Sequence, residues 1–141
     1  MCKKIFCIFL SAITMLCFGT IANAQSNVES NSDFDIQPYY GYTNNQSTDL
    51  IISGGQAICE SSLTGYSGTT TKVTITMYLE KKTLWWWSTE ASWSDTFYSY
   101  YGTLSKAFAV KGGTYRVRTV YVVYCGNENE TVTGYSSEVK Y

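Results

Sequence analysis

Three stretches of the chain alternate apolar and polar residues with a period of two, which is typical of β-strands that bury one face. Residues 72–80 show it most clearly, with one parity made of Val73, Ile75, Met77 and Leu79. The same alternation in residues 56–64 and 115–125 gives two further inward parities: Ala57, Cys59, Ser61 and Leu63, and Tyr115, Val117, Thr119, Tyr121, Val123 and Cys125. No window shows a 3.6-residue apolar stripe, so the sequence predicts an all-β fold.

Glycine-bearing turns separate these runs from four fainter candidate strands. The turn signals fall at residues 53–55, 65–68, 102, 111–113 and 126–127, and the fainter strands at 49–53, 85–97, 104–110 and 131–141. About seven strands at this spacing predict a two-sheet antiparallel sandwich, immunoglobulin-like in architecture. A single barrel is the other all-β option. The specific immunoglobulin marks are missing, since Val123 stands two residues before Cys125 where the corner tyrosine would be.

The first 24 residues have the pattern of a secretory signal peptide. Lys3 and Lys4 precede an apolar stretch at 5–21, and Ala22-Asn23-Ala24 is a small-residue cleavage site. We expect cleavage after Ala24 and a secreted, extracellular product. An uncleaved membrane anchor is the alternative, because the apolar run is close to the ~18 residues that cross a bilayer. Residues 25–41 are polar and predict a flexible N-terminal segment, followed by a sandwich domain at 42–141.

Two cysteines remain after the leader, Cys59 and Cys125, and both fall on an inward parity. An even cysteine count in an exported protein predicts a disulfide across the core. Closing a loop of this length is worth about 4 kcal/mol in the chain-entropy model. Two buried free thiols are the alternative. A metal site would need further His or Cys ligands, and the chain has 0 His, so we expect no metal and no cofactor.

Charge and composition exclude several classes of function. Of the 10 Lys and Arg, Lys3 and Lys4 belong to the leader, so eight remain against 11 Asp and Glu, a net charge of −3. This balance argues against nucleic acid and an anionic membrane as electrostatic partners. The lack of His removes the commonest general base. Glu90 and Asp95 could formally act as a carboxylate pair, but we interpret both as solvated residues and expect no enzyme.

Every tryptophan of the chain lies in residues 85–93, next to Lys81 and Lys82. Strand alternation would put Trp85, Trp87 and Trp93 on one face and Trp86 on the other, so at least one ring should be exposed. Two tyrosine clusters flank this tract in the sequence: Tyr39, Tyr40 and Tyr42, and Tyr98, Tyr100 and Tyr101. The ligand-contact candidates are Trp85, Trp86, Tyr100 and Tyr101. Trp87 and Trp93 are expected to stabilise the fold, and packing is the alternative role for all of these rings.

Much of residues 50–141 resembles a family of small secreted proteins of Gram-positive anaerobic bacteria, a domain of unknown function. The resemblance is carried by residues 52–59, 64–68, 72–77, 79–82, 113–117 and 135–141, together with Trp86, Trp87 and Trp93. It implies export and a compact β domain, and it supplies no catalytic residues.

The sequence therefore predicts a secreted, non-catalytic binding module that uses a Trp/Tyr-rich surface, with a glycan or a protein surface as partner. Exposed indoles can stack on sugar rings or anchor a protein partner. The alternative is a bacteriocin-like or membrane-active protein that uses the tryptophans together with Lys81 and Lys82. The net charge of −3 counts against that alternative, and we expect no membrane partner.

Overall fold

The computed structural model describes residues 39–141, which form eight β-strands and no helix. The all-β prediction is confirmed for this part of the chain. The predicted signal peptide and residues 25–38 of the predicted flexible segment lie outside the described residues. No described helix is long and apolar enough to cross a membrane. The strands are β1 (Thr43–Ser53), β2 (Gln56–Gly65), β3 (Lys72–Lys82), β4 (Trp87–Phe97), β5 (Tyr101–Ala109), β6 (Thr114–Cys125), β7 (Glu128–Tyr135) and β8 (Val139–Lys140).

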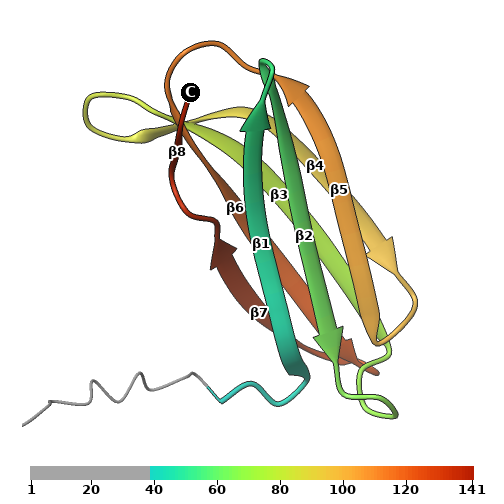
Figure 1. Ribbon diagram of the computed structural model, residues 1–141. Helices are drawn as coiled ribbons and strands as arrows, with labels where there is room; N and C mark the ends of the chain where they lie inside the picture. The colour runs from blue at the N-terminus through green and yellow to red at the C-terminus, as the bar shows by residue number, and fades with distance from the viewer. Residues whose placement is uncertain (1–38) are drawn as a thin grey trace, which may run out of the picture. The chain divides into compact units, whose positions relative to one another are not determined.

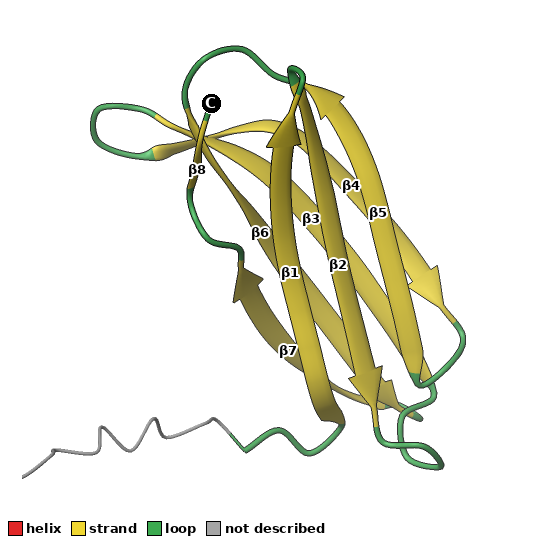
Figure 2. Ribbon diagram, in the orientation of Figure 1, coloured by secondary structure: helices red, strands yellow, loops and turns green. Residues whose placement is uncertain are grey.

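The strands form two antiparallel sheets that pack face to face (Figures 1 and 2). One sheet has the order β1-β2-β5, and the other has the order β4-β3-β6-β7 with the short β8 also paired to β6. The sandwich is thus confirmed, and it is the two-sheet form rather than a single barrel. Its first hairpin closes through Gly54 and Gly55, whose φ angles of 57° and 78° suit the tight two-residue turn between Ser53 and Gln56.

The inward-facing residues of β2, β3 and β6 form the core, as their alternation predicts. Every residue of the three predicted inward parities is buried except Cys125. One polar pair bridges the two sheets, since the hydroxyls of Ser61 and Thr119 lie 2.7 Å apart in a hydrogen bond. Near it, the Tyr121 hydroxyl donates to the carbonyl of Ser47 and is hydrogen-bonded to the Thr48 hydroxyl at 2.7 Å. These buried hydroxyls are therefore satisfied within the protein.

Because most strands run the length of the sandwich, the loops gather at two ends. The upper end in Figure 1 carries residues 54–55, 83–86 and 110–113 and the C-terminal Tyr141. The lower end carries residues 39–42, 66–71, 98–100 and 126–127. A residue's position along its strand thus determines which end of the molecule it lies near.

The structure does not contain the predicted disulfide: Cys59 and Cys125 are both free. The cysteines have the predicted parity but lie at different levels of the sandwich. With Ser61 hydrogen-bonded to Thr119, Cys59 lies two residues toward the upper end and Cys125 lies six residues toward the lower end. At ~3.3 Å per residue, this offset is on the order of 25 Å. A disulfide needs Cα atoms within about 7 Å.

The chain enters the sandwich at the lower end, where Glu130 of β7 fixes it. The Glu130 carboxylate accepts hydrogen bonds from the backbone N–H of Gly41 at 2.9 Å and of Tyr42 at 3.0 Å. It also accepts one from the Thr43 hydroxyl at 2.7 Å. The Tyr42 hydroxyl donates to Glu128, and this bond to a carboxylate raises the pKa of Tyr42 to about 12. Two carboxylates of β7 therefore hold the start of β1 in place.

Candidate functional site

The loop between β3 and β4 projects from the upper end (Figure 1), and its residues include two tryptophans and a leucine. Thr83 closes this loop, because its backbone N–H donates to the carbonyl of Trp86 at 2.8 Å. Its hydroxyl also donates to that carbonyl, at 2.7 Å, and accepts from the backbone N–H of Trp86 at 3.2 Å. These three hydrogen bonds join the two ends of the turn. We call Leu84, Trp85 and Trp86 the tryptophan tip.

The side chains of the tryptophan tip face solvent. Leu84 is 92% exposed, Trp85 86% and Trp86 64%. The prediction that at least one tryptophan is exposed is confirmed, and Leu84 is an apolar neighbour that the aromatic pattern did not single out. A contiguous apolar projection of this kind is uncommon on a protein surface, which makes the tip a candidate interaction site. Its chemistry is apolar and aromatic contact, since none of its three side chains is ionisable.

Trp87 and Trp93 lie on opposite faces of their sheet, so the prediction that they share a face is wrong. The reason is a β-bulge: Leu79 pairs with Ala91, Glu80 pairs with Thr89, and Glu90 is the extra residue between them. Trp93, beyond the bulge, packs against the core and meets Phe108 edge to face, with ring centroids 6.2 Å apart. Trp87, before the bulge, lies on the outer face of the sheet.

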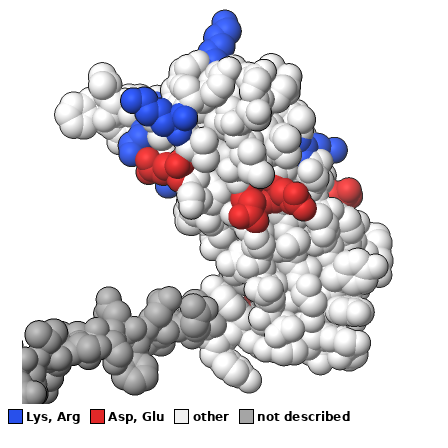
Figure 3. Space-filling view, in the orientation of Figure 1, with Lys and Arg blue, Asp and Glu red and all other residues white. Residues whose placement is uncertain are grey.

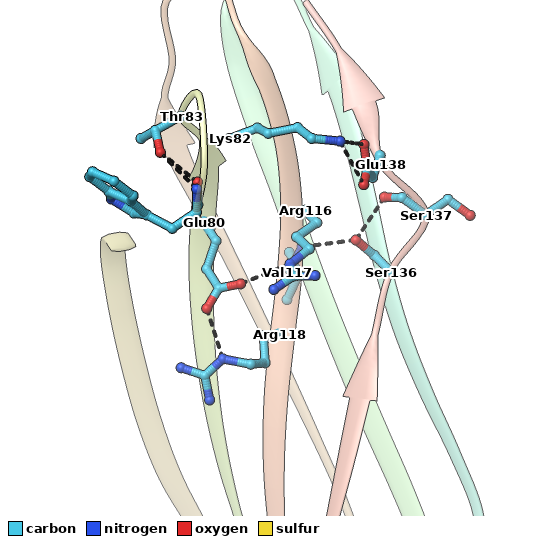
Figure 4. Close-up of polar contacts among 10 residues, drawn as sticks. Glu80, Lys82, Thr83, Arg116, Val117, Arg118, Ser136, Ser137 and Glu138 are labelled. Carbon is cyan, nitrogen blue, oxygen red and sulfur yellow. Dashed lines mark hydrogen bonds and ion pairs between the residues drawn. The ribbon is translucent and has the colours of Figure 1, made fainter. Parts of the chain in front are cut away.

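An ion-pair cluster on that outer face supports the base of the tip (Figure 4). The buried carboxylate of Glu80 accepts hydrogen bonds from Nε of Arg116 at 2.8 Å and Nε of Arg118 at 2.7 Å. The Arg116 guanidinium lies between the rings of Trp87 and Tyr135, at 4.1 Å and 4.7 Å from their centroids. Such stacking adds to the ion pairs. Sequence reasoning missed this cluster, although the outward parity of Arg116 and Arg118 in a core strand was a visible signal.

A second ion pair lies beside the cluster and joins β3 to the C-terminal segment. Nζ of Lys82 contacts the carboxylate of Glu138 at 2.9 Å (Figure 4). Both side chains are about half exposed, with 51% and 48% of their area accessible. This pair is therefore screened by solvent, in contrast to the buried Glu80.

The tyrosine candidates lie at the other end of the molecule. Tyr100 and Tyr101 are exposed at the start of β5, with their rings edge to face at a centroid distance of 5.4 Å. Tyr98 and Tyr66, also exposed, belong to loops of the same lower end. The 11 residues of β4 separate this group from the tryptophan tip, which corresponds to about 35 Å of extended chain. The prediction of one Trp/Tyr-rich surface is wrong, because the two aromatic groups form separate surfaces.

A cleft opens at the upper end, with a volume of about 310 Å³. It is lined by Phe108, Ala109, Val110 and Tyr115 and by the charged residues Lys81, Lys111 and Glu90. Nζ of Lys81 lies 5.4 Å from the Tyr115 ring centroid. Asp95 is five residues from Glu90 along β4, or about 16 Å. That exceeds the separation of the two carboxylates in glycosidases. The described residues also hold no cluster of three or more His, Cys, Asp or Glu that could bind a metal.

Comparison with known proteins yields no family. No protein-family model matches the chain, and no curated protein does. Among solved structures, the chain is similar to wild-type OgpA from Akkermansia muciniphila in two crystal forms, with 11% identity and TM-scores of 0.41 and 0.42. It is similar to catalytically inactive OgpA in complex with an O-glycopeptide (glycodrosocin) substrate, with 11% identity and a TM-score of 0.41. These matches cover 72% of this chain but only 31% or 32% of OgpA, so the chain spans about a third of that protein's length.

Proposed function

We propose that this chain is an exported, non-catalytic binding module whose contact element is the tryptophan tip. The observation that supports it is the exposure of Leu84, Trp85 and Trp86 on a loop whose shape is fixed by the hydrogen bonds of Thr83. Tryptophan is enriched among the residues that dominate binding energy in interfaces. Because the turn is already ordered, binding loses less conformational entropy than it would with a disordered loop.

The apolar area of the tip sets the energy that its burial can contribute to binding. Fully burying a large apolar side chain contributes about 1.5–3 kcal/mol. Three such side chains would contribute roughly 5–9 kcal/mol before the loss of translational and rotational freedom is subtracted. Affinity in the micromolar range corresponds to about 8 kcal/mol. Burial of the tip can thus supply a large part of the gross binding energy, and contacts around it must offset the loss of translational and rotational freedom.

Export is part of the proposal and is supported by the leader pattern of residues 1–24 and by the resemblance to a family of secreted proteins. N-terminal sequencing of protein recovered from culture medium should begin at Gln25. A sequence beginning at Met1 contradicts cleavage.

The experiment for the binding role compares Trp85→Ala and Trp86→Ala with Tyr98→Ala. Tyr98 is a matched control because it is 86% exposed, like Trp85, but lies at the lower end. Retention is measured on insoluble chitin, cellulose and peptidoglycan and on sedimented phospholipid vesicles. The proposal expects retention on at least one of these probes that falls with the tip variants and persists with Tyr98→Ala. Retention that survives both tip substitutions, or retention on no probe, contradicts it.

A further inference from the structure

We propose that the tryptophan tip inserts into the interfacial layer of a membrane that contains anionic lipids. This inference rests on the proposed function, since it names the partner of the same contact element. It reverses the expectation drawn from net charge, and the reason is the distribution of charge that the fold creates.

The chemistry of the tip fits a lipid interface better than a sugar. A sugar-binding aromatic platform needs hydrogen-bonding groups beside the ring, because each sugar hydroxyl must find a partner. The only hydroxyl in the loop belongs to Thr83, and it is occupied by the backbone of Trp86. Leu84, at 92% exposure, offers nothing to a sugar hydroxyl. In a lipid interface, by contrast, leucine reaches the acyl boundary and indole rings occupy the headgroup level.

The folded domain has no net charge of its own. Residues 39–141 contain eight Lys and Arg and eight Asp and Glu. The three further acidic residues that make the expected secreted chain negative are Glu29, Asp33 and Asp35. They all precede the described domain. The net charge of −3 therefore does not describe the surface around the tip.

Fold topology then places an excess of positive charge at the upper end. Within four residues of the strands' upper ends, and in the loops and short strand there, the basic residues are Lys81, Lys82, Lys106, Lys111, Arg116, Arg118 and Lys140. The acidic residues at the same levels are Asp49, Glu60, Glu80, Glu90 and Glu138, which leaves an excess of two positive charges. At the lower end, Lys72 stands against Asp95, Glu128 and Glu130. Figure 3 shows blue surface at the upper end, with red patches beside and just below it and little charge on the lower half of this face.

The apolar tip and the basic residues occupy the same end, so they can act together. Lys82 immediately precedes the loop, and Arg116 is held against Trp87 immediately after it. Inserting the tip therefore brings these cations to the level of the lipid phosphates. Lys111 and Lys140, for which the described residues provide no ion pair, add attraction at longer range. A protein target would not require the basic residues to surround the apolar projection, whereas an anionic bilayer uses both features at once.

The test measures binding of the protein to vesicles of phosphatidylcholine alone and of phosphatidylcholine mixed with phosphatidylglycerol. Sedimentation gives the affinity, and tryptophan fluorescence reports entry into an apolar layer. We expect binding to the mixed vesicles with a blue shift, and affinity that falls with added salt because the attraction is electrostatic. The double variant Trp85→Ala/Trp86→Ala should bind about tenfold or more weakly, because binding scales with buried apolar area.

Two charge variants test the contribution of the basic residues to membrane binding. Lys111→Glu/Lys140→Glu should bind several-fold more weakly, and the matched control Lys72→Glu, at the lower end, should bind like the native protein. Thermal melts confirm that each variant is folded. Equal binding to both vesicle types, or binding that survives the tip substitutions, overturns the inference. Tip-dependent retention on a glycan without vesicle binding overturns it and leaves the proposed function intact. Binding to neither overturns both.

Discussion

Replacing Glu80 by glutamine should destabilise the domain far more than the same replacement at Glu138. Glu80 is 6% exposed at its side chain and holds two arginines, at 2.8 Å and 2.7 Å. A hydrogen bond to a charged group is worth about 1.5–3 kcal/mol, and glutamine retains one neutral bond of about 1 kcal/mol. Arg116 and Arg118 are 24% and 27% exposed at their side chains, so water recovers part of the loss. We therefore expect Glu80→Gln to cost about 2–3 kcal/mol.

Glu138→Gln is the matched control because it removes the same charge from an ion pair that is about half exposed. Pairs of this kind contribute about 0–1 kcal/mol. For a domain of this size, a loss of 1 kcal/mol lowers Tm by roughly 4–8 °C. Glu80→Gln should therefore lower Tm by roughly 10–20 °C, and Glu138→Gln by less than about 8 °C. Thermal and urea unfolding followed by circular dichroism measure both. Equal losses would refute the reasoning, since they would mean that burial of Glu80 adds nothing to its two ion pairs.

Three further predictions concern the thiols, the alkaline limit and the tryptophans. At pH 8 Cys125 should react with a thiol reagent while Cys59 stays unlabelled, because burial raises the pKa of the Cys59 thiol to about 11. Mass spectrometry of the labelled peptides measures this, and the detection of disulfide-linked peptides of Cys59 and Cys125 would contradict it. Burial raises the pKa of Cys59 and of Tyr121, so both stay neutral in the folded state while the unfolded groups ionise. Ionisation of these two groups should therefore leave stability unaffected below pH 9 and lower it as pH rises from 9 toward 11, which urea titrations at each pH would measure. Trp93→Ala should cost about 3 kcal/mol and Trp85→Ala less than about 0.5 kcal/mol; similar losses in unfolding experiments would mean that Trp85 is part of the core.

The strands that alternate cleanly were predictable because one buried face forces a period of two. Val73 and Ile75 are buried beside polar Thr74 for that reason alone. The first half of β1 was not predictable, because residues 43–48 are polar and carry no alternation. They form a strand through backbone pairing with β2 and through the hydrogen bond between Thr48 and Tyr121. Neither contact is visible in the local amino-acid pattern of β1.

Only part of the candidate site could be predicted from the sequence. Strand parity predicts which face of a sheet a residue lies on, but not its level along the sandwich. The opposing parities of neighbouring rings predicted at least one exposed tryptophan, but Trp85 and Trp86 are both exposed because they lie in the loop before β4. The bulge at Glu90, which reverses the faces of Trp87 and Trp93, has no signal in the side-chain pattern. The absence of the predicted disulfide has the same origin, because Cys59 and Cys125 have inward parity on two facing sheets but lie at different levels along the strands. Height depends on how the two sheets slide against each other, which is a tertiary property.

The hydrogen bonds of Glu130 to Gly41 and Tyr42 fix the start of the described chain at the lower end of the sandwich. The two ends of the domain therefore lie at opposite ends of the molecule, which matters when the protein is attached to a surface. Tyr39 lies at the lower end, whereas Tyr141 is fixed at the upper end by two backbone hydrogen bonds with Gly113, at 2.8 Å and 2.9 Å. A coupling group on Tyr39 would thus hold the protein on a support with its tryptophans facing the solution, roughly one strand length or about 35 Å away. The same group on Tyr141 would press them against the support. Immobilisation through the two ends should consequently give opposite results in any surface-based binding measurement.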